Sequence, residues 1–220
     1  SEAVASIIEV KEESWNYVPP KLDVEINSVA IGLDGTCMLL CETGWREAMV
    51  GTVSLYDAQG ERQHTIYIGA TPEYGKAQFL ERLEREIQRT KDRYPQATYI
   101  GIADGAASNW QFLKGHTSEQ VLDFYHASGY LGAVAVALYP KDLIQQKQWL
   151  DASCHQLKHD AGAVTELYAQ MLKLSQSAAH PKAIQDNLNA AVTYFHNHLH
   201  QMNYAYYRHR HYPIGSGVTE

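Results

Sequence analysis

The 220-residue sequence predicts an α/β fold in which a mixed sheet is followed by an all-helical block. Three observations lead to this prediction. Strand-like apolar runs fill much of the first half, a helical period interrupts them near residue 80, and strand signals vanish after about residue 126. A chain of this length can bury a proper core without disulfide or metal staples.

Strand signals open the folded part. We expect strands at residues 25–33, 37–42 and 47–57, and residues 63–69 either add a short strand or extend the meander. Asp34 follows the first run directly, and Thr43 and Gly44 supply turn chemistry between the next two. Three antiparallel strands in sequence is the economical arrangement.

A helix is expected at residues 75–93, where apolar residues recur at three and four positions before Pro95. Residues 98–103 form a buried strand that ends on Asp104, followed by Gly105. A short helix at 108–114 and a fifth strand at 120–125 come next. From there Ala, Leu, Gln, Lys and His dominate, and Pro140 and Pro181 separate about four helices.

These patterns divide the chain into four segments. Residues 1–21 are a lead-in closed by Pro19 and Pro20, residues 22–138 a core, residues 139–212 a helical insertion, and residues 213–220 a return to the core through the glycine loop 215–217.

Composition excludes several classes of protein. With 18 Lys and Arg against 25 Asp and Glu, the formal charge is -7, which argues against a surface that coats nucleic acid throughout. No apolar run approaches about 18 residues, so we expect no membrane span. Three cysteines and no signal-like start favour a reducing, cytoplasmic location.

Two acids stand out because each ends a predicted strand and precedes glycine, which would let the backbone approach a ligand closely: Asp34 and Asp104. The element order matches the ribonuclease H-like topology, in which a mixed sheet is followed by a last helix after any insertion. There the first and fourth strands are neighbours, so both carboxylates would converge on one sheet edge and favour Mg²⁺. Taken singly, each Asp-Gly is more typical of a simple turn.

The chain also resembles the catalytic core of bacterial insertion-sequence transposases of the DDE type, over roughly residues 20–220. The resemblance is to members with a ribonuclease H-like mixed sheet and a large all-α insertion before the last catalytic helix. Four ordered motifs carry it: Asp34-Gly35-Thr36, Ala103-Asp104-Gly105-Ala106 with Asn109-Trp110, Leu122-Asp123-Phe124-Tyr125-His126-Ala127, and Gly215-Ser216-Gly217-Val218-Thr219-Glu220.

The resemblance implies a metal-binding triad of Asp34, Asp104 and Glu220 that holds two Mg²⁺ or Mn²⁺ ions. Asp123 and His126 match an Asp-x-x-His motif beside the second acid, where they would either contact DNA or cap and orient the chain. It further implies transposon-end and target DNA as partners, a homo-oligomer assembled on DNA, and a bacterial, nucleoid-associated enzyme. Because Glu220 is the final residue, we expect this piece alone to be inactive or very weak.

Four residues are candidates for DNA contact. Trp149 is the candidate for stacking on an unpaired base, whereas Trp110 is favoured as a core or loop anchor. Arg208 and Arg210 lie in an aromatic and basic tract, residues 204–212, which suits a nucleic-acid backbone. The alternative is that its tyrosines pack and its charges are solvated.

Two other signals are set aside. In the run His196-Asn197-His198-Leu199-His200, the pair His196 and His200 has zinc-protease spacing, but Asn197 stands where that motif needs Glu, so a chance surface pair is favoured. Cys37 and Cys41 have no second pair and are expected to act as small apolar residues. The alternatives to a transposase are a ribonuclease H-like nuclease or resolvase without strand transfer, and an inactive DNA-binding fragment.

Overall fold

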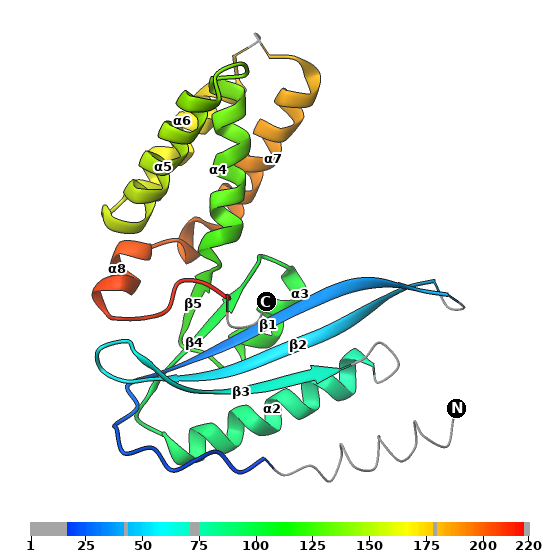
Figure 1. The fold of residues 1–220 in the computed structure, drawn as a ribbon, viewed down its shortest axis with the longest axis vertical. Helices are drawn as coiled ribbons and strands as arrows, with labels where there is room; N and C mark the ends of the chain where they lie inside the picture. The colour runs from blue at the N-terminus through cyan, green and yellow to red at the C-terminus, as the bar shows by residue number, and fades with distance from the viewer. Residues whose placement is uncertain (1–16, 42–43, 71–74, 178–179, 218–220) are drawn as a thin grey trace.

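The computed structural model describes residues 17–41, 44–70, 75–177 and 180–217, and a five-stranded mixed sheet lies at its centre (Figure 1). The strands are β1 (Ser28–Leu40), β2 (Gly44–Tyr56), β3 (Arg62–Ala70), β4 (Thr98–Ala103) and β5 (Glu119–Leu122). They lie in the order β3-β2-β1-β4-β5. The first three are antiparallel, and β4 and β5 run parallel to β1. This α/β arrangement is compatible with a ribonuclease H-like fold.

The first strand corrects the sequence prediction. A break after Leu33 was expected, but β1 continues to Leu40 and Asp34 lies in its middle. The reason is pairing with β2: Asp34 lies opposite Val50, and Gly35 opposite Met49, so a ladder partner is present where turn chemistry was predicted. By contrast, β4 has the predicted bounds.

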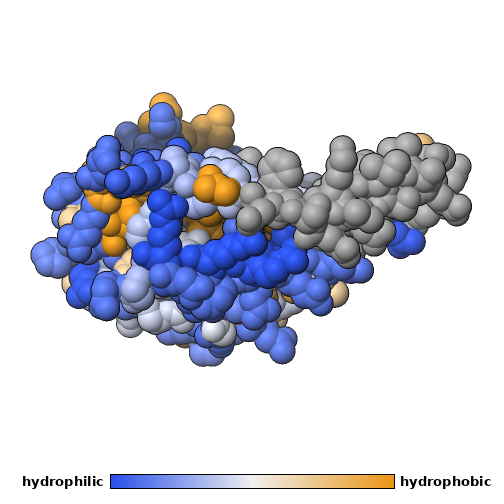
Figure 2. Space-filling model, turned by 90° about the horizontal axis from the view of Figure 1, so that it is seen from below, coloured by the Kyte–Doolittle hydropathy of each residue, from blue (hydrophilic) through white to orange (hydrophobic). Residues whose placement is uncertain are grey.

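Helices α2 (Lys76–Arg93) and α3 (Ala107–Lys114) cover one face of the sheet. Gly51 of β2 admits α2, since a Cβ there would lie 3.1 Å from side-chain atoms of Phe79 and Leu83. Gly101 of β4 does the same for Leu113 of α3, at 3.2 Å. The outer side of α2 carries mostly exposed charged and polar residues, and Figure 2 shows a largely hydrophilic surface on this side of the molecule.

A helical block follows β5 and comprises α4 (Phe124–Leu138), α5 (Leu143–His159), α6 (Ala163–Ser175), α7 (Lys182–His198), a 3₁₀ turn (Leu199–Gln201) and α8 (Tyr204–His209). The fifth strand was expected to reach residue 125, but α4 takes over at Phe124. Helix α4 packs against α5 and α7, so it belongs with the block by its contacts. No helix within the described ranges is long and apolar enough to cross a membrane.

The described end of the lead-in packs on the sheet domain. The Arg93 guanidinium donates to the carbonyls of Pro19 and Pro20, at 3.2 and 3.0 Å. Tyr17 Oη lies 2.8 Å from His64 Nε2. Burial, with a smaller contribution from Arg93, lowers the pKa of His64, so a neutral imidazole faces the phenol. The ordered structure therefore begins before Leu22, where the sequence placed its start.

Strand β5 lies at the edge of the sheet, and two tyrosines of α8 satisfy its outer carbonyls. Tyr204 donates to the carbonyl of Leu122 at 2.9 Å, and Tyr207 to that of Gln120 at 3.0 Å. Burial raises the pKa of Tyr204, which keeps its hydroxyl protonated as a donor. An uncovered edge would offer these groups to another strand. The tyrosines thus join the block to the sheet.

Replacing Tyr204 by Phe should leave the buried Leu122 carbonyl without its partner. We expect Tyr204→Phe to lower the free energy of unfolding by about 1–3 kcal/mol in urea denaturation. Tyr206→Phe is the matched control on the same helix, because Tyr206 is 38% exposed; its change should stay within about 0.5 kcal/mol. Equal losses in the two variants would contradict this role for Tyr204.

Candidate functional site

Asp34 and Asp104 occupy corresponding positions on neighbouring parallel strands. The ladder between β1 and β4 ends with Gly32 opposite Ile102, and each acid comes two residues later on its own chain. Since side chains alternate along a strand, Asp34 projects from the same face as Gly32, opposite to the face that α2 and α3 cover. We call this second face, with Ala30, Gly32, Asp34 and Ile102, the acid face. Both acids are partly exposed.

The first acid is held by its own strand and by α3. Asp34 Oδ1 accepts a hydrogen bond from the amide of Gly35 at 2.7 Å. The carbonyl of Leu33, one residue earlier, accepts from the buried Asn109 side chain at 3.4 Å. A Cβ on Gly35 would meet the side chain of Glu47, so this glycine admits a further carboxylate next to Asp34. The close approach of a ligand at this glycine remains a prediction.

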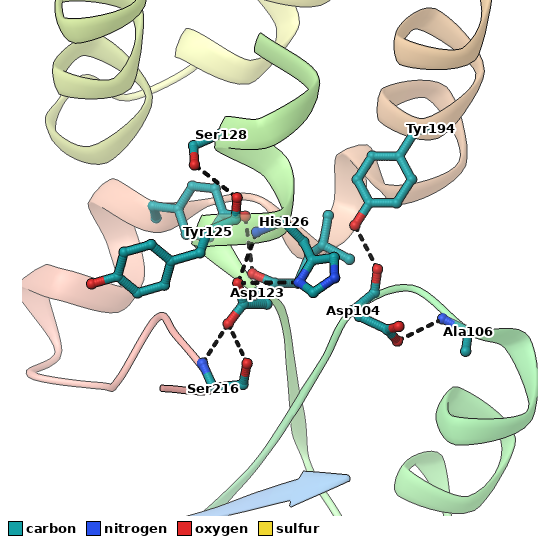
Figure 3. Close-up of polar contacts among 10 residues, drawn as sticks. Asp104, Ala106, Asp123, Tyr125, His126, Ser128, Tyr194 and Ser216 are labelled. Atoms are coloured by element: carbon teal, nitrogen blue, oxygen red, sulfur yellow. Dashed lines mark hydrogen bonds and ion pairs between the residues drawn. The ribbon is translucent and has the colours of Figure 1, made fainter. Parts of the chain in front are cut away.

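The second acid is held by α7. Asp104 Oδ1 accepts from the amide of Ala106 at 3.1 Å, and the Asp104 carbonyl accepts from the hydroxyl of Tyr194 at 2.6 Å (Figure 3). Gly105 has φ +112°, which favours glycine. A Cβ there would meet His198 Nε2 at 3.0 Å and the Tyr194 ring at 3.1 Å. Gly105 thus admits the side chains of helix α7.

Asp123 joins the two ends of the helical block. It is 0% exposed and caps α4 by accepting from the amide of His126 at 2.9 Å. Its other oxygen accepts from both the amide and the hydroxyl of Ser216, the latter at 2.6 Å (Figure 3). The amide of Phe124 donates to the carbonyl of Ile214 at 2.9 Å. The capping role foreseen for Asp123 is confirmed.

His126 stands beside this cap and is 45% exposed at its side chain, with Nδ1 3.7 Å from Asp123 Oδ1. Its ring is open to the surface, so either role considered for it remains a prediction. Gly215 lets the returning chain pass, because a Cβ there would lie 3.1 Å from the ring of Tyr125.

The returning segment lies against the acid face. Gly215 and Ser216 line a small cavity of about 10 Å³ together with Ala30, Gly32 and Ile102. Glu220, the predicted third ligand, lies outside the described residues. In the part of the chain that is described, no group of three or more His, Cys, Asp or Glu side chains is placed to hold a metal ion. Of the predicted triad, Asp34 and Asp104 belong to the described residues and Glu220 does not.

The four candidates for DNA contact differ in their burial. Trp110 is 5% exposed in α3, as expected of a core anchor, and it offers no ring to a base. Trp149 is only partly buried in α5 and packs against the core. Arg208 and Arg210 are exposed, but Arg210 donates to Tyr212 Oη at 3.2 Å. Tyr204, Tyr207 and Tyr212 of the same tract are buried, so the packing alternative holds for these tyrosines.

Two residues beside the second acid were missed by sequence reasoning: Tyr194, which contacts Asp104, and His198, which lies against Gly105. His198 was noted only as the middle of a histidine run, and Tyr194 carried no motif, although their i,i+4 spacing puts both on one side of α7. Cys37 and Cys41 are exposed and free, so the prediction that they fill apolar space was wrong.

An open groove runs between α4 and α7 beside the Asp123 cap. Its volume is about 560 Å³ and its lining combines aromatic rings with small residues: Tyr125, His126, Gly129, Tyr130, Ala133, Asn187 and Ala190. A second cavity of about 230 Å³ includes Lys158, whose Nζ lies 4.3 Å from the centroid of the Phe124 ring. The Lys158 cation thus lies beside the returning segment, since Ile214 and Gly215 line the same cavity.

Comparison with protein-family models and with curated proteins found no match to this chain.

Asp123→Ala removes a helix cap and the tie to Ser216 together. We expect a loss of at least about 2 kcal/mol in the free energy of unfolding and faster hydrogen exchange at the Ser216 amide. Asp142→Ala is the control, since Asp142 only caps α5, through the amides of Ile144 and Gln145. It should lose about 1 kcal/mol and leave Ser216 unchanged. Unchanged exchange at Ser216 in Asp123→Ala would refute the tie.

Proposed function

We propose that the chain is the catalytic core of a DDE-type DNA transposase that hydrolyses a phosphodiester at a transposon end and then joins the freed 3′-hydroxyl to target DNA. The observation that carries the proposal is the placement of Asp34 and Asp104, two partly exposed carboxylates that each follow the last ladder pair of the adjacent parallel strands β1 and β4 by two residues. A turn role for each acid taken separately gives no reason for this alignment.

The donor set fits a hard divalent cation. Carboxylate oxygens are the ligands that Mg²⁺ and Mn²⁺ prefer, and neighbouring strands lie about 4.8 Å apart, which brings two carboxylates within reach of shared ions. Asp34, Asp104 and Glu220 would hold two ions. When bound, these supply activation of a water or hydroxyl and charge stabilisation at the leaving oxygen.

The rest of the chain orients these acids. Asn109 and Tyr194 fix the main chain next to Asp34 and at Asp104. Asp123 holds Ser216 against the acid face, and Glu220 follows four residues later. Asp34 and Asp104 are thereby each given a main-chain support from another element.

The path of the chain supports an insertion. It leaves the sheet after β5 and returns at residues 214–216 to the residue from which it left, so α4 to α8 form an excursion from a ribonuclease H-like sheet before a last catalytic helix. We propose further that the excursion orients DNA ends, that the protein assembles as a homo-oligomer on DNA, and that it works in the bacterial cytoplasm at the nucleoid.

In the intact protein, Asp34→Asn and Asp104→Asn should each reduce Mg²⁺-dependent nicking of DNA that carries the element's terminal sequences by more than about 100-fold, because each removes a charged metal ligand. Asp92→Asn is the charge-matched control on the exposed side of α2. Gel assays that score nicking and strand transfer separately provide the measurement.

Two outcomes would overturn parts of this proposal. Full nicking by Asp104→Asn would remove the carboxylate site altogether. Nicking without strand transfer by the parent protein, supplied with intact ends and target, would make it a nuclease rather than a transposase.

A further inference from the structure

Tyr194 of α7 reaches into the loop of the second acid from a distance of 90 residues in sequence. Its hydroxyl donates to the main-chain carbonyl of Asp104 at 2.6 Å, and Figure 3 shows the phenol pointing down onto that carbonyl. The carbonyl belongs to the peptide that joins Asp104 to Gly105. The hydrogen bond to this carbonyl therefore restrains the orientation of the Asp104–Gly105 peptide plane.

The orientation of the Asp104 carboxylate depends on this turn. Its Oδ1 accepts from the amide of Ala106 at 3.1 Å, and that amide is presented correctly only while Gly105 keeps φ +112°. A rotation of the Asp104–Gly105 peptide would move the amide of Ala106 and release the carboxylate. Tyr194 thus restrains the carboxylate through the backbone.

The Tyr194 ring is itself restrained on two sides. Tyr130 of α4 stacks on it with ring centroids 4.0 Å apart and ring planes 19° from parallel. On another side, the centroid of the His198 ring lies 4.9 Å from that of Tyr194. His198 Nδ1 contacts Gln201 Oε1 at 2.7 Å, and Gln201 Nε2 donates to Gln120 of β5 at 3.3 Å. Burial, with smaller contributions from Tyr130 and Asp104, raises the pKa of Tyr194, so the hydroxyl stays a donor.

We propose that Tyr194 is a positioning residue for the metal-binding carboxylate of Asp104, so that the helical block and not the sheet alone sets the geometry of the metal site. This rests on the proposed function, because it takes Asp104 to be a metal ligand. It assigns to Tyr194 an effect on metal affinity, which a role in folding alone would not produce.

The test is a titration of the purified protein with Mn²⁺, followed by the electron paramagnetic resonance signal of the free ion. Tyr194→Phe keeps the ring and its stack and removes only the hydroxyl. We expect it to weaken Mn²⁺ binding about 10-fold, the size of effect seen when an outer support of a ligand is lost.

Tyr207→Phe is the matched control. Tyr207 also joins the block to the sheet through a hydroxyl that donates to a main-chain carbonyl, that of Gln120 at 3.0 Å, but it touches neither acid. It should lose stability in urea denaturation and keep the parent affinity for Mn²⁺. Tyr130→Leu, which removes the stacked ring and spares the hydroxyl, should weaken Mn²⁺ binding in the same direction as Tyr194→Phe.

Asp104→Asn separates the two ways in which this idea can fail. If Asp104→Asn loses Mn²⁺ while both Tyr194→Phe and Tyr130→Leu keep the parent affinity, the positioning role is wrong and the proposed metal site stands. If Asp104→Asn binds Mn²⁺ as the parent does, the metal site itself is wrong. Equal weakening in Tyr194→Phe and Tyr207→Phe would reduce Tyr194 to a general structural contact.

Discussion

The structure depends most on one buried carboxylate, that of Asp123. Its two oxygens serve two segments: one closes the first turn of α4, and the other receives Ser216 from the returning chain, 93 residues after Asp123. A fully buried carboxylate is tolerated only where hydrogen bonds compensate its lost hydration. Because both sets of donors meet at this residue, the exit from the sheet and the return to it are fixed at a single point.

From that point the helical block is fastened to the sheet through hydroxyl groups of tyrosine. Tyr204 and Tyr207 take the free carbonyls of β5, and Tyr194 takes that of Asp104. Each pairs a long aromatic side chain with a main-chain acceptor, which combines apolar burial with a polar end. These three tyrosines of the last part of the sequence therefore lie where the helical block meets the sheet.

Elements with a clear short-range sequence pattern could be predicted from the sequence. The run 98–103 gave β4 with correct bounds, and the period of Phe79, Leu83 and Ile87 gave α2. Asp34 was placed at a strand end because Gly35 resembles a turn residue, whereas pairing with Met49 of β2 extends the strand. The alignment of the acids followed from the element order, but the contact of Tyr194 with Asp104 could not be foreseen, since no short-range pattern links residues 90 positions apart.

The shared exit and return at Asp123 has a consequence for how such a chain can vary in length. Because the excursion begins and ends at one place, residues can be gained or lost at its far end without moving any strand. That freedom is unequal along the block. Helices α4, α7 and α8 contact the loop of Asp104, the Tyr194 ring or β5, and α5 packs on α8, so these helices are constrained, whereas changes in α6 would be absorbed within the block. The connection between α6 and α7 is therefore the natural place for a fused domain or label.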